Sequence, residues 1–420
     1  MDPTSSRQSS PSPSLWANRD YKVLVAGQGM SSIGDAVSFT ALPLLVLQLT
    51  GSGLAMGVVG MLEMLPDLVF GLPAGALADR WDRRRMMLLA DLGRAILIAL
   101  IPLSVLLGLP TMAVILAVTA PIHLLRVVFM AAFTASVPSL VGRDQIGPAN
   151  SYLEALFSLG FILGPAIAGL LAAQIGPGPT LAIDACSFLL SGASLSLIKR
   201  PLRARSAPAD THLLAEIRDG ISFVARHPVL RTTIAFWSSL SIASAPLIPA
   251  LTFYMTVDRG LGPGALGLVI SAYSIGSLLG ALGASRLTRG RVGGLLLAGN
   301  AITGILLIAI SSQSTIAPML GMAFVAGISN SLVLITYITV RAAASPDELL
   351  GRVGSTARTI SLGLQPLGYL AGGVILDLTG GATTMAAMGL VMFLVSGVFA
   401  LSATLRGARV ATSAPGPAVL

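Results

Sequence analysis

Long apolar segments follow one another along almost the whole chain, and they limit the folds open to it more than any other feature. They lie at 23–48, 54–78, 85–108, 112–137, 150–173, 179–198, 229–256, 263–287, 293–311, 315–340, 354–376 and 382–405. A helix that crosses a bilayer needs about 20 mostly apolar residues. Only 10% of the 420 residues are charged, whereas about 25% are charged in a soluble domain. The sequence therefore predicts an all-α integral membrane protein with twelve transmembrane helices, and it excludes a soluble enzyme.

The positive charges set the expected orientation. If the N-terminus is cytoplasmic, almost all of the 26 Lys and Arg fall in cytoplasmic segments or at their helix ends, apart from Arg94 and Arg126 inside the membrane and Arg259 outside. Positively charged loops stay on the cytoplasmic side during insertion. We expect a multi-pass protein of the bacterial cytoplasmic membrane with both termini in the cytoplasm. The net charge of +8 then reflects topology rather than nucleic-acid binding.

The chain is expected to form two bundles of six helices, at 21–198 and 229–405, joined by a cytoplasmic linker at 199–228. Two tails flank them: 1–20 is rich in Ser and Pro, and 406–420 is rich in Ala, Pro and Gly. Segments of this composition bury too little apolar surface to fold, so both tails are predicted to be disordered.

The linker contains one predicted helix. Apolar residues between Leu213 and Val224 recur at helical spacing, with charged residues on the other face. An amphipathic helix of this kind either lies on the inner leaflet or packs against the bundle. Both arrangements fit the same residues.

An internal repeat relates the two bundles at an offset of 208 residues. The matched pairs are Gly160 with Gly368, Gly164 with Gly372, Pro165 with Gly373, Gly75 with Gly283 and Arg83 with Arg291. Transporters built from two related halves move substrate by rocking one half against the other. The repeat therefore predicts a pseudo-symmetric transporter.

The loop after the second segment carries the clearest motif. It contains Gly75, Asp79, Arg80, Arg83 and Arg84. Gly75 permits a close helix approach, and Asp79 is suited to bond the N-terminus of a facing helix, where the macrodipole favours negative charge. The arginines are suited to pair with acids when this face closes. The alternative is a basic loop that only sets topology.

This loop resembles the G-x-x-x-D-R-x-G-R-R signature of the major facilitator superfamily, with Asp82 in place of the second Gly. The fifth segment resembles the antiporter motif of exporters in that superfamily through Gly160, Gly164, Pro165 and Gly169. The resemblance implies a gating role for the loop and an export function for the chain.

Smaller features resemble one branch of the superfamily, the macrolide-efflux and enterobactin exporters. They are Gly34-Asp35, Asn150-Ser151, the run from Asp184 to Phe188, and Gly351-Arg352-Val353. This resemblance implies proton-driven export of a drug-like or siderophore-like molecule.

Ionisable residues inside the membrane are candidates for proton coupling because burying them is costly. Asp35 and Arg126 lie at similar depths, close to the midplane, and could pair. Glu63 and Asp67 are four residues apart and share a helix face. We predict that Asp35, with Glu63 or Asp67 as alternatives, binds the coupled proton. Its protonation would break the pairing with Arg126 and shift the balance between two openings.

Other polar residues divide unevenly between the bundles. Asp91 and Arg94 are three apart and are expected to neutralise each other as a structural pair. The second bundle has no comparable midplane charges; its polar positions are Asn300, Asn330, Gln365, Ser238, Ser239, Ser241 and Ser244. We therefore expect the first bundle to handle protons and the second to shape the substrate cavity.

The function predicted from the sequence is proton-coupled efflux of an amphipathic drug, antibiotic or siderophore by alternating access. The alternatives are a proton-symport importer of a nutrient and a non-transporting relative that acts as a sensor. We expect no catalytic residues, because neither an HExxH nor a GxSxG motif occurs. One Cys and three His make a metal site improbable. The expected partners are a small molecule, protons and lipid; the proton gradient replaces any cofactor, and the chain is expected to act as a monomer.

Overall fold

The computed structural model describes residues 15–202, 213–287, 290–346 and 349–410. The parts of the tails at 1–14 and 411–420, and of the linker at 203–212, lie outside the described residues. In the first half of the chain the helices are η1 (Leu15–Ala17), α1 (Arg19–Thr50), α2 (Gly53–Ala78), α3 (Arg83–Leu106), α4 (Thr111–Val141), η2 (Arg143–Gln145), α5 (Ile146–Ile175), α6 (Pro177–Thr180) and α7 (Ala182–Ser196).

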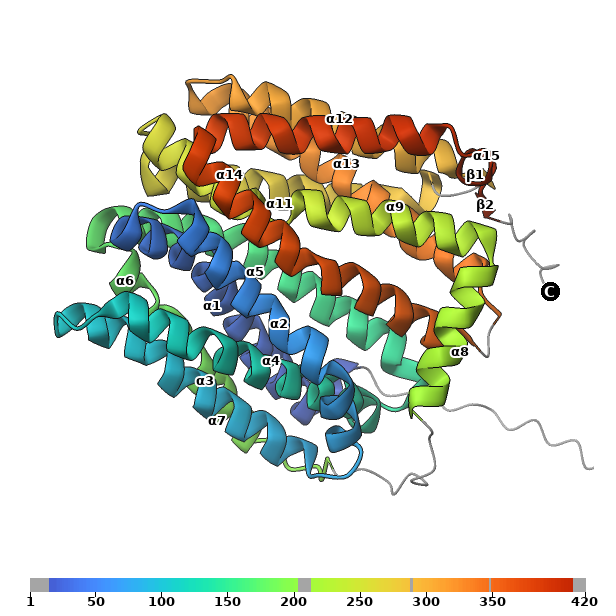
Figure 1. The fold of residues 1–420 in the computed structure, drawn as a ribbon. Helices are drawn as coiled ribbons and strands as arrows, with labels where there is room; N and C mark the ends of the chain where they lie inside the picture. Colours follow the sequence, from blue (N-terminus) through green and yellow to red (C-terminus); the bar gives the residue numbers. More distant parts are fainter. Residues whose placement is uncertain (1–14, 203–212, 288–289, 347–348, 411–420) are drawn as a thin grey trace, which may run out of the picture.

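The linker holds α8 (Leu213–Arg226). The second half consists of α9 (Pro228–Ser244), α10 (Leu247–Phe253), η3 (Tyr254–Asp258), α11 (Gly262–Leu287), β1 (Gly290–Arg291), α12 (Gly293–Ser311), α13 (Ile316–Ala343), α14 (Leu350–Ala400), α15 (Ala403–Arg406) and β2 (Arg409–Val410). In Figure 1 the blue-to-green half lies below the yellow-to-red half.

These elements make the twelve predicted membrane crossings. Ten helical stretches in the described residues are long and apolar enough to span a bilayer. The short pair α6 and α7 supplies one more crossing. The stretch α14 supplies two, because Gly380 has φ 80° and ψ 174° and turns the chain back on itself. The backbone groups in the interior of these helices mostly bond one another within the same helix, as a lipid environment requires.

The repeat holds, with one correction to its register. Within the first half, Gly160 and Gly164 on α5 approach α1. Within the second half, Gly368 and Gly372 on α14 approach α9 and the residues that lead into α10. However, the first residues of α5 and α14 are separated in the sequence by four residues fewer than the predicted offset of 208. Gly176, which follows α5, and Gly380, which ends the first part of α14, both have positive φ and show the same separation. Gly164 therefore corresponds to Gly368 and Gly169 to Gly373, so the three pairs predicted between these two helices are wrong by about one helical turn. Local glycine spacing could not fix this register, because both helices repeat small residues every four positions.

The linker helix packs against the second half, which is the second of the two arrangements allowed by the sequence. A Cβ placed on Gly220 would lie 2.5 Å from the Thr356 hydroxyl oxygen of α14. Val224 is buried in one cluster with Val353 and Ala357. In Figure 1, α8 lies at the right, beside the start of α14.

Residues 15–20 and 406–410 were predicted to belong to disordered tails, and this is wrong for both segments. Before residue 20, Leu15 is buried and Trp16 packs edge-on against Tyr21 and Tyr152, with ring centroids 6.2 and 5.2 Å apart. After residue 406, β2 pairs antiparallel with β1. Aromatic packing and strand pairing order these few residues, although their composition is typical of a flexible tail.

Candidate transport site

The two halves approach each other closely at one end. We call it the far end: α2 and α11 begin there, and α5 ends there. A Cβ on Gly57 would lie 2.4 Å from the Tyr369 carbonyl oxygen, and one on Gly267 would lie 2.2 Å from the Pro165 carbonyl oxygen. Such spacing lets only glycine stand at these positions, so α2 packs on α14 and α5 packs on α11 backbone to backbone.

The halves are apart at the opposite end, which we call the linker end because α8 and the α2–α3 loop lie there. A Cβ placed on Gly71 or on Gly75 of α2 would meet no atom within 4 Å beyond its own helix. Gly75 was predicted to allow a close helix approach, and in this conformation it makes none. The structure is therefore closed at the far end and open at the linker end.

A cavity of about 400 Å³ lies between the halves. Phe39 of α1 and Phe161 of α5 form its wall from the first half, with their rings edge to face at 5.6 Å. Most of the lining comes from the second half, and its hydrogen-bonding side chains are Ser244, Tyr273, Ser274, Thr303, Asn330, Gln365 and Tyr369. None of its lining residues in the described part of the chain is charged. An apolar cavity with a few polar groups suits a small amphipathic ligand.

The polar positions expected to shape the cavity divide into two groups. Asn330, Gln365 and Ser244 line it. Asn300 does not: its side-chain amide donates to the Met392 carbonyl and the Ser396 hydroxyl, both at 2.7 Å. Asn300 therefore joins α12 to the part of α14 that follows Gly380. We call the parts of α14 before and after Gly380 its first and second arms.

The intramembrane charges of α2 pair with α4. Glu63 lies 4.0 Å from His123, and Asp67 lies 3.3 Å from the guanidinium of Arg126. All four side chains are partly buried, with exposed fractions of 21% for His123, 22% for Glu63, 28% for Asp67 and 43% for Arg126. Spacings of four residues on α2 and three on α4 stack the two pairs along one interface. We call these residues the α2–α4 ladder.

The expected pairing of Asp35 with Arg126 is wrong, because Arg126 bonds Asp67 instead. The cause is helix packing, since α4 lies along α2 over most of its length and touches α1 much less. Residue counts give the expected depth of a side chain along its own helix, but depth does not select the neighbouring helix. Asp35 is half-buried on α1, within electrostatic reach of Arg94 and Arg126.

Two acidic positions were not among the predicted site residues, although Asp184 belongs to the run that resembles one branch of the superfamily. Asp184 on α7 is 2% exposed and accepts hydrogen bonds from Ser38 of α1 and Ser187 of α7. It interacts electrostatically with Asp35. The available signal was a lone acid within an apolar segment, followed three residues later by serine. The second position, Asp377, is described below.

The Asp91–Arg94 pair is a structural one, as expected. The carboxylate of Asp91 accepts a hydrogen bond from Arg94, and both residues are buried. The guanidinium lies over the rings of Phe129 and Phe188, 4.7 and 4.1 Å from their centroids. Aromatic faces and a carboxylate thus replace water around a buried cation.

The predicted gating loop bonds within the first half. Asp79 pairs with Arg83 at 3.6 Å and bonds no facing helix N-terminus. Arg83 donates to the Ala135 carbonyl of α4 at 2.7 Å, and Arg84 donates to the Leu195 carbonyl of α7 at 3.0 Å. Arg84 therefore binds a carbonyl in the last turn of α7, at the negative end of the helix dipole, whereas the Ala135 carbonyl lies before the last turn of α4. Among the described residues, neither of these arginines pairs with an acid of the second half. Arg80 is exposed.

The predicted antiporter motif serves two interfaces. Gly160 and Gly164 face Ser32 and Ala36 of α1 inside the first half. Starting at the next residue, the Pro165 carbonyl and then Gly169 face α11 across the boundary between the halves. The small-residue stripe therefore connects the packing of one half with closure of the far end.

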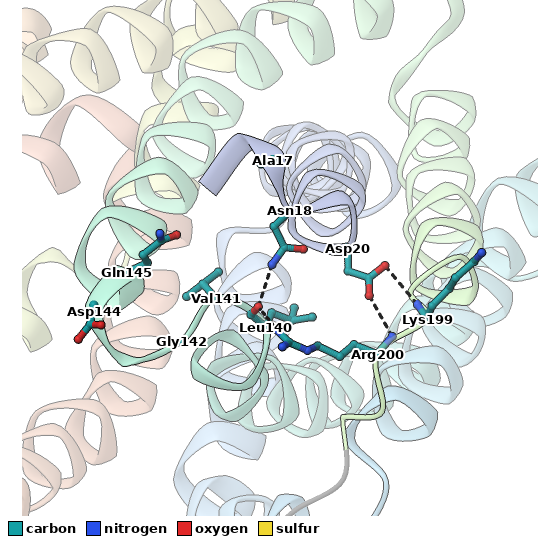
Figure 2. A pocket seen from close by; sticks show the side chains of 10 residues that line it. All are labelled: Ala17, Asn18, Asp20, Leu140, Val141, Gly142, Asp144, Gln145, Lys199 and Arg200. Carbon is teal, nitrogen blue, oxygen red and sulfur yellow. Dashed lines mark hydrogen bonds between the residues drawn. The ribbon is translucent and has the colours of Figure 1, made fainter. Parts of the chain in front are cut away.

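A second cavity, of about 740 Å³, lies at the linker end where the chain leaves α7 (Figure 2). The Asp20 carboxylate accepts the backbone N–H groups of Lys199 and Arg200 at 3.2 and 2.9 Å. Asn18 and the Arg200 guanidinium both donate to the Leu140 carbonyl. These contacts fasten the start of the linker to α1 and α4, outside the space between the halves.

Two six-helix halves, a central cavity and closure at one end define a multi-pass membrane transporter with the major facilitator fold. Residues 12–416 match the family described as transmembrane secretion effector, and the chain belongs to that family of the superfamily. The multidrug efflux pump Tap of Mycolicibacterium fortuitum is 32% identical over 386 residues, 89% of this chain and 92% of that protein.

Other relatives agree with this assignment. Macrolide efflux protein A of Streptococcus pyogenes is 26% identical over 271 residues, 64% of this chain and 66% of that protein. Among solved structures, the nucleoside transporter NupG, as its D323A mutant, aligns with a TM-score of 0.78 and 14% identity over 91% of this chain and 99% of that one. This likeness supports the fold alone.

Proposed function

We propose that this chain exports an amphipathic small molecule across the bacterial cytoplasmic membrane in exchange for protons. The observation that carries the proposal is the position of the α2–α4 ladder beside an uncharged central cavity. Tyr369 lines that cavity, its ring packs on Gly60 of α2, and it lies within electrostatic reach of Glu63. Efflux is the activity named for the pump Tap and for macrolide efflux protein A.

The ladder supplies groups for the proton. When a proton neutralises Asp67, Arg126 loses its partner and must find another or meet water, which changes the packing of α2 against α4. Glu63 and His123 form a second site one turn away. Asp35 is a further candidate because Arg126 acts on it electrostatically. A change in protonation then favours one opening of the two halves over the other, which couples the proton gradient to transport.

We assign the linker end to the cytoplasm. The basic α2–α3 loop and the linker lie at that end, and positive loops remain cytoplasmic. The conformation described here is then open to the cytoplasm, so that substrate enters the cavity from the cell interior. The proposal includes cytoplasmic termini and a monomeric transporter, in which one chain contains the whole cavity.

Proton release from inside-out vesicles tests the proposal. Vesicles that contain the protein are acidified inside, and a lumenal pH dye is followed while lipophilic cations, macrolides or catecholate siderophores are added. Export coupled to protons makes one class of compound raise the lumenal pH. The control is the double variant Glu63→Gln/Asp67→Asn at equal membrane level, which should show no response.

Two outcomes would contradict the proposal. If compounds bind but never move protons, coupling is wrong, and a uniporter or a non-transporting relative replaces the exporter. If compounds acidify the lumen further, protons and substrate move together, and an importer by symport replaces it.

A further inference from the structure

Asp377 lies at the far end of the first arm of α14, and its carboxylate reaches across to the other half of the molecule. It accepts a hydrogen bond from the Ser52 hydroxyl at 2.8 Å and from the Leu54 N–H at 3.1 Å, and it also accepts the N–H of Gly53. Three donors at the start of α2 therefore converge on one side chain of α14. We propose that Asp377 is a latch that holds the far end closed and is released when that end opens.

The chemistry of a helix N-terminus explains why this contact is favourable. The first N–H groups of a helix have no partner within it, and the helix dipole favours an anion there. The hydroxyl of Ser52 caps α2 by accepting the Ala55 N–H at 3.1 Å. The N–H groups of Gly53 and Leu54 are bonded instead by a residue more than 300 positions away. Separation of the halves at this end must return those donors and the carboxylate to water.

Neighbouring backbone contacts hold the Asp377 carboxylate in position over α2. One turn before Asp377, a Cβ on Gly373 would lie 2.8 Å from the Gly53 carbonyl oxygen and 3.0 Å from the Leu54 Cα. Leu376, which is on α14 like Gly373, packs on Gly53 of α2. The backbone approach at Gly373 therefore places Asp377 over the first turn of α2. Asp377 itself is exposed, so the latch can open without moving a charge through an apolar layer.

The latch is one-sided. In the repeat register observed for α5 and α14, Ala173 stands at the position equivalent to Asp377. At that second interface Gly169 approaches the Pro263 carbonyl oxygen of α11 directly. Among the described residues, backbone packing closes one side of the far end, and packing together with a carboxylate closes the other. On the α2–α14 side, a substitution of this carboxylate can therefore destabilise the closed state without removing the backbone packing.

Distance measurements between the halves test the latch without any substrate. In a Cys186→Ser background, spin labels at residues 107 and 312 report the far end, since Leu107 and Ser312 end α3 and α12 and are exposed. In Asp377→Ala, the loss of hydrogen bonds to a charged group is expected to raise the far-open population about tenfold. In Ser52→Ala the shift should have the same direction and be smaller.

Asp258→Asn is the matched control. The Asp258 carboxylate accepts the N–H of Ala382 at 2.7 Å, at the start of the second arm of α14. This is also an acid at a helix N-terminus, but both partners belong to the second half. Asp258→Asn should leave the distance distribution unchanged. The latch is refuted if neither Asp377→Ala nor Ser52→Ala shifts the far-end distances, or if Asp258→Asn shifts them equally.

The effect of the latch on export rests on the proposed function, whereas its effect on the far end does not. A vesicle assay with no proton response in the unmodified protein, together with shifted distances in Asp377→Ala, would remove the exporter and keep the latch. A proton response with unchanged distances would keep the exporter and remove the latch. Ser52→Ala removes a single hydroxyl, so it still tests the latch if Asp377→Ala is poorly folded.

Discussion

The two halves share one packing plan and differ in chemistry. The first half contains the α2–α4 ladder and the buried Asp91–Arg94 pair. The second half contributes most of the central cavity, through polar groups that carry no charge. In the register set by Gly75 and Gly283, Ser271 and Ile275 of α11 stand where Glu63 and Asp67 stand in α2. A repeated backbone therefore does not require a repeated function.

This difference has a physical reason. Charges in a membrane need partners within reach, and each added charge makes the surrounding helices depend on that partner. Uncharged hydroxyl and amide groups can change partners at a lower cost when a ligand enters. Ionisable groups in one half and uncharged polar groups in the other allow proton binding and substrate binding to be altered separately.

The largest expected effect comes from breaking the buried pair of the first half. Arg94→Ala leaves Asp91 buried without its cation, and the loss of one partner of such a pair costs about 3–5 kcal/mol. The melting temperature of the purified protein in detergent should fall strongly. The control is Arg19→Ala, because the Arg19 side chain is 54% exposed, whereas that of Arg94 is 3% exposed. Equal melting temperatures for Arg94→Ala and the unmodified protein would show that Arg94 is not a structural cation.

The next effect concerns the ladder. Asp67→Asn and Glu63→Gln should each lower proton-coupled export at least about tenfold, a change that corresponds to about 1.4 kcal/mol. Binding of a substrate to the cavity, followed by fluorescence, should change much less. Asp144→Asn is the control, because Asp144 lies at the second cavity and not between the halves. If export persists in both ladder variants and is lost in Asp35→Asn, the coupled proton belongs to Asp35.

A smaller effect is expected in the cavity of the second half. Gln365→Leu and Asn330→Leu each remove a hydrogen-bonding group, which is worth about 0.5–1.5 kcal/mol. The KM of a hydrogen-bonding substrate should rise by about 2–10-fold, while the protons moved per substrate stay constant. Ser239→Ala is the control, because the Ser239 hydroxyl donates to the Ala235 carbonyl of its own helix and does not line the cavity among the described residues. A changed proton ratio would contradict the division of roles between the halves.

The smallest effect is expected at the loop between α2 and α3. The Asp79 side chain is 61% exposed, and exposed ion pairs contribute about 0–1 kcal/mol. Asp79→Asn should therefore leave the melting temperature nearly unchanged. Arg83→Gln should lower it more, because Arg83 also bonds the carbonyls of Ala78 and Ala135. If Asp79→Asn proves as destabilising as Arg83→Gln, the loop has partners beyond the first half.

Membrane crossings and buried polar residues could be predicted because each depends on a short stretch of sequence. The predicted segment at 293–311 matches α12 at both ends, and Gln365 and Asn330 line the cavity as expected. The partner of Arg126 could not be predicted in this way. Depth follows from counting residues along one helix, whereas the choice between Asp35 and Asp67 depends on which helix lies beside α4.

Hydrophobic length, the distribution of arginines and the glycine repeat already specify a twelve-helix transporter with two related halves, because these properties act within segments of about 20 residues. Tertiary packing specifies what joins the segments. It pairs Asp67 with Arg126, sets the repeat register in which Gly380 matches Gly176, and brings Asp377 to the first turn of α2. Such contacts depend on the rotation and spacing of helices far apart in the chain, and a linear pattern carries neither quantity.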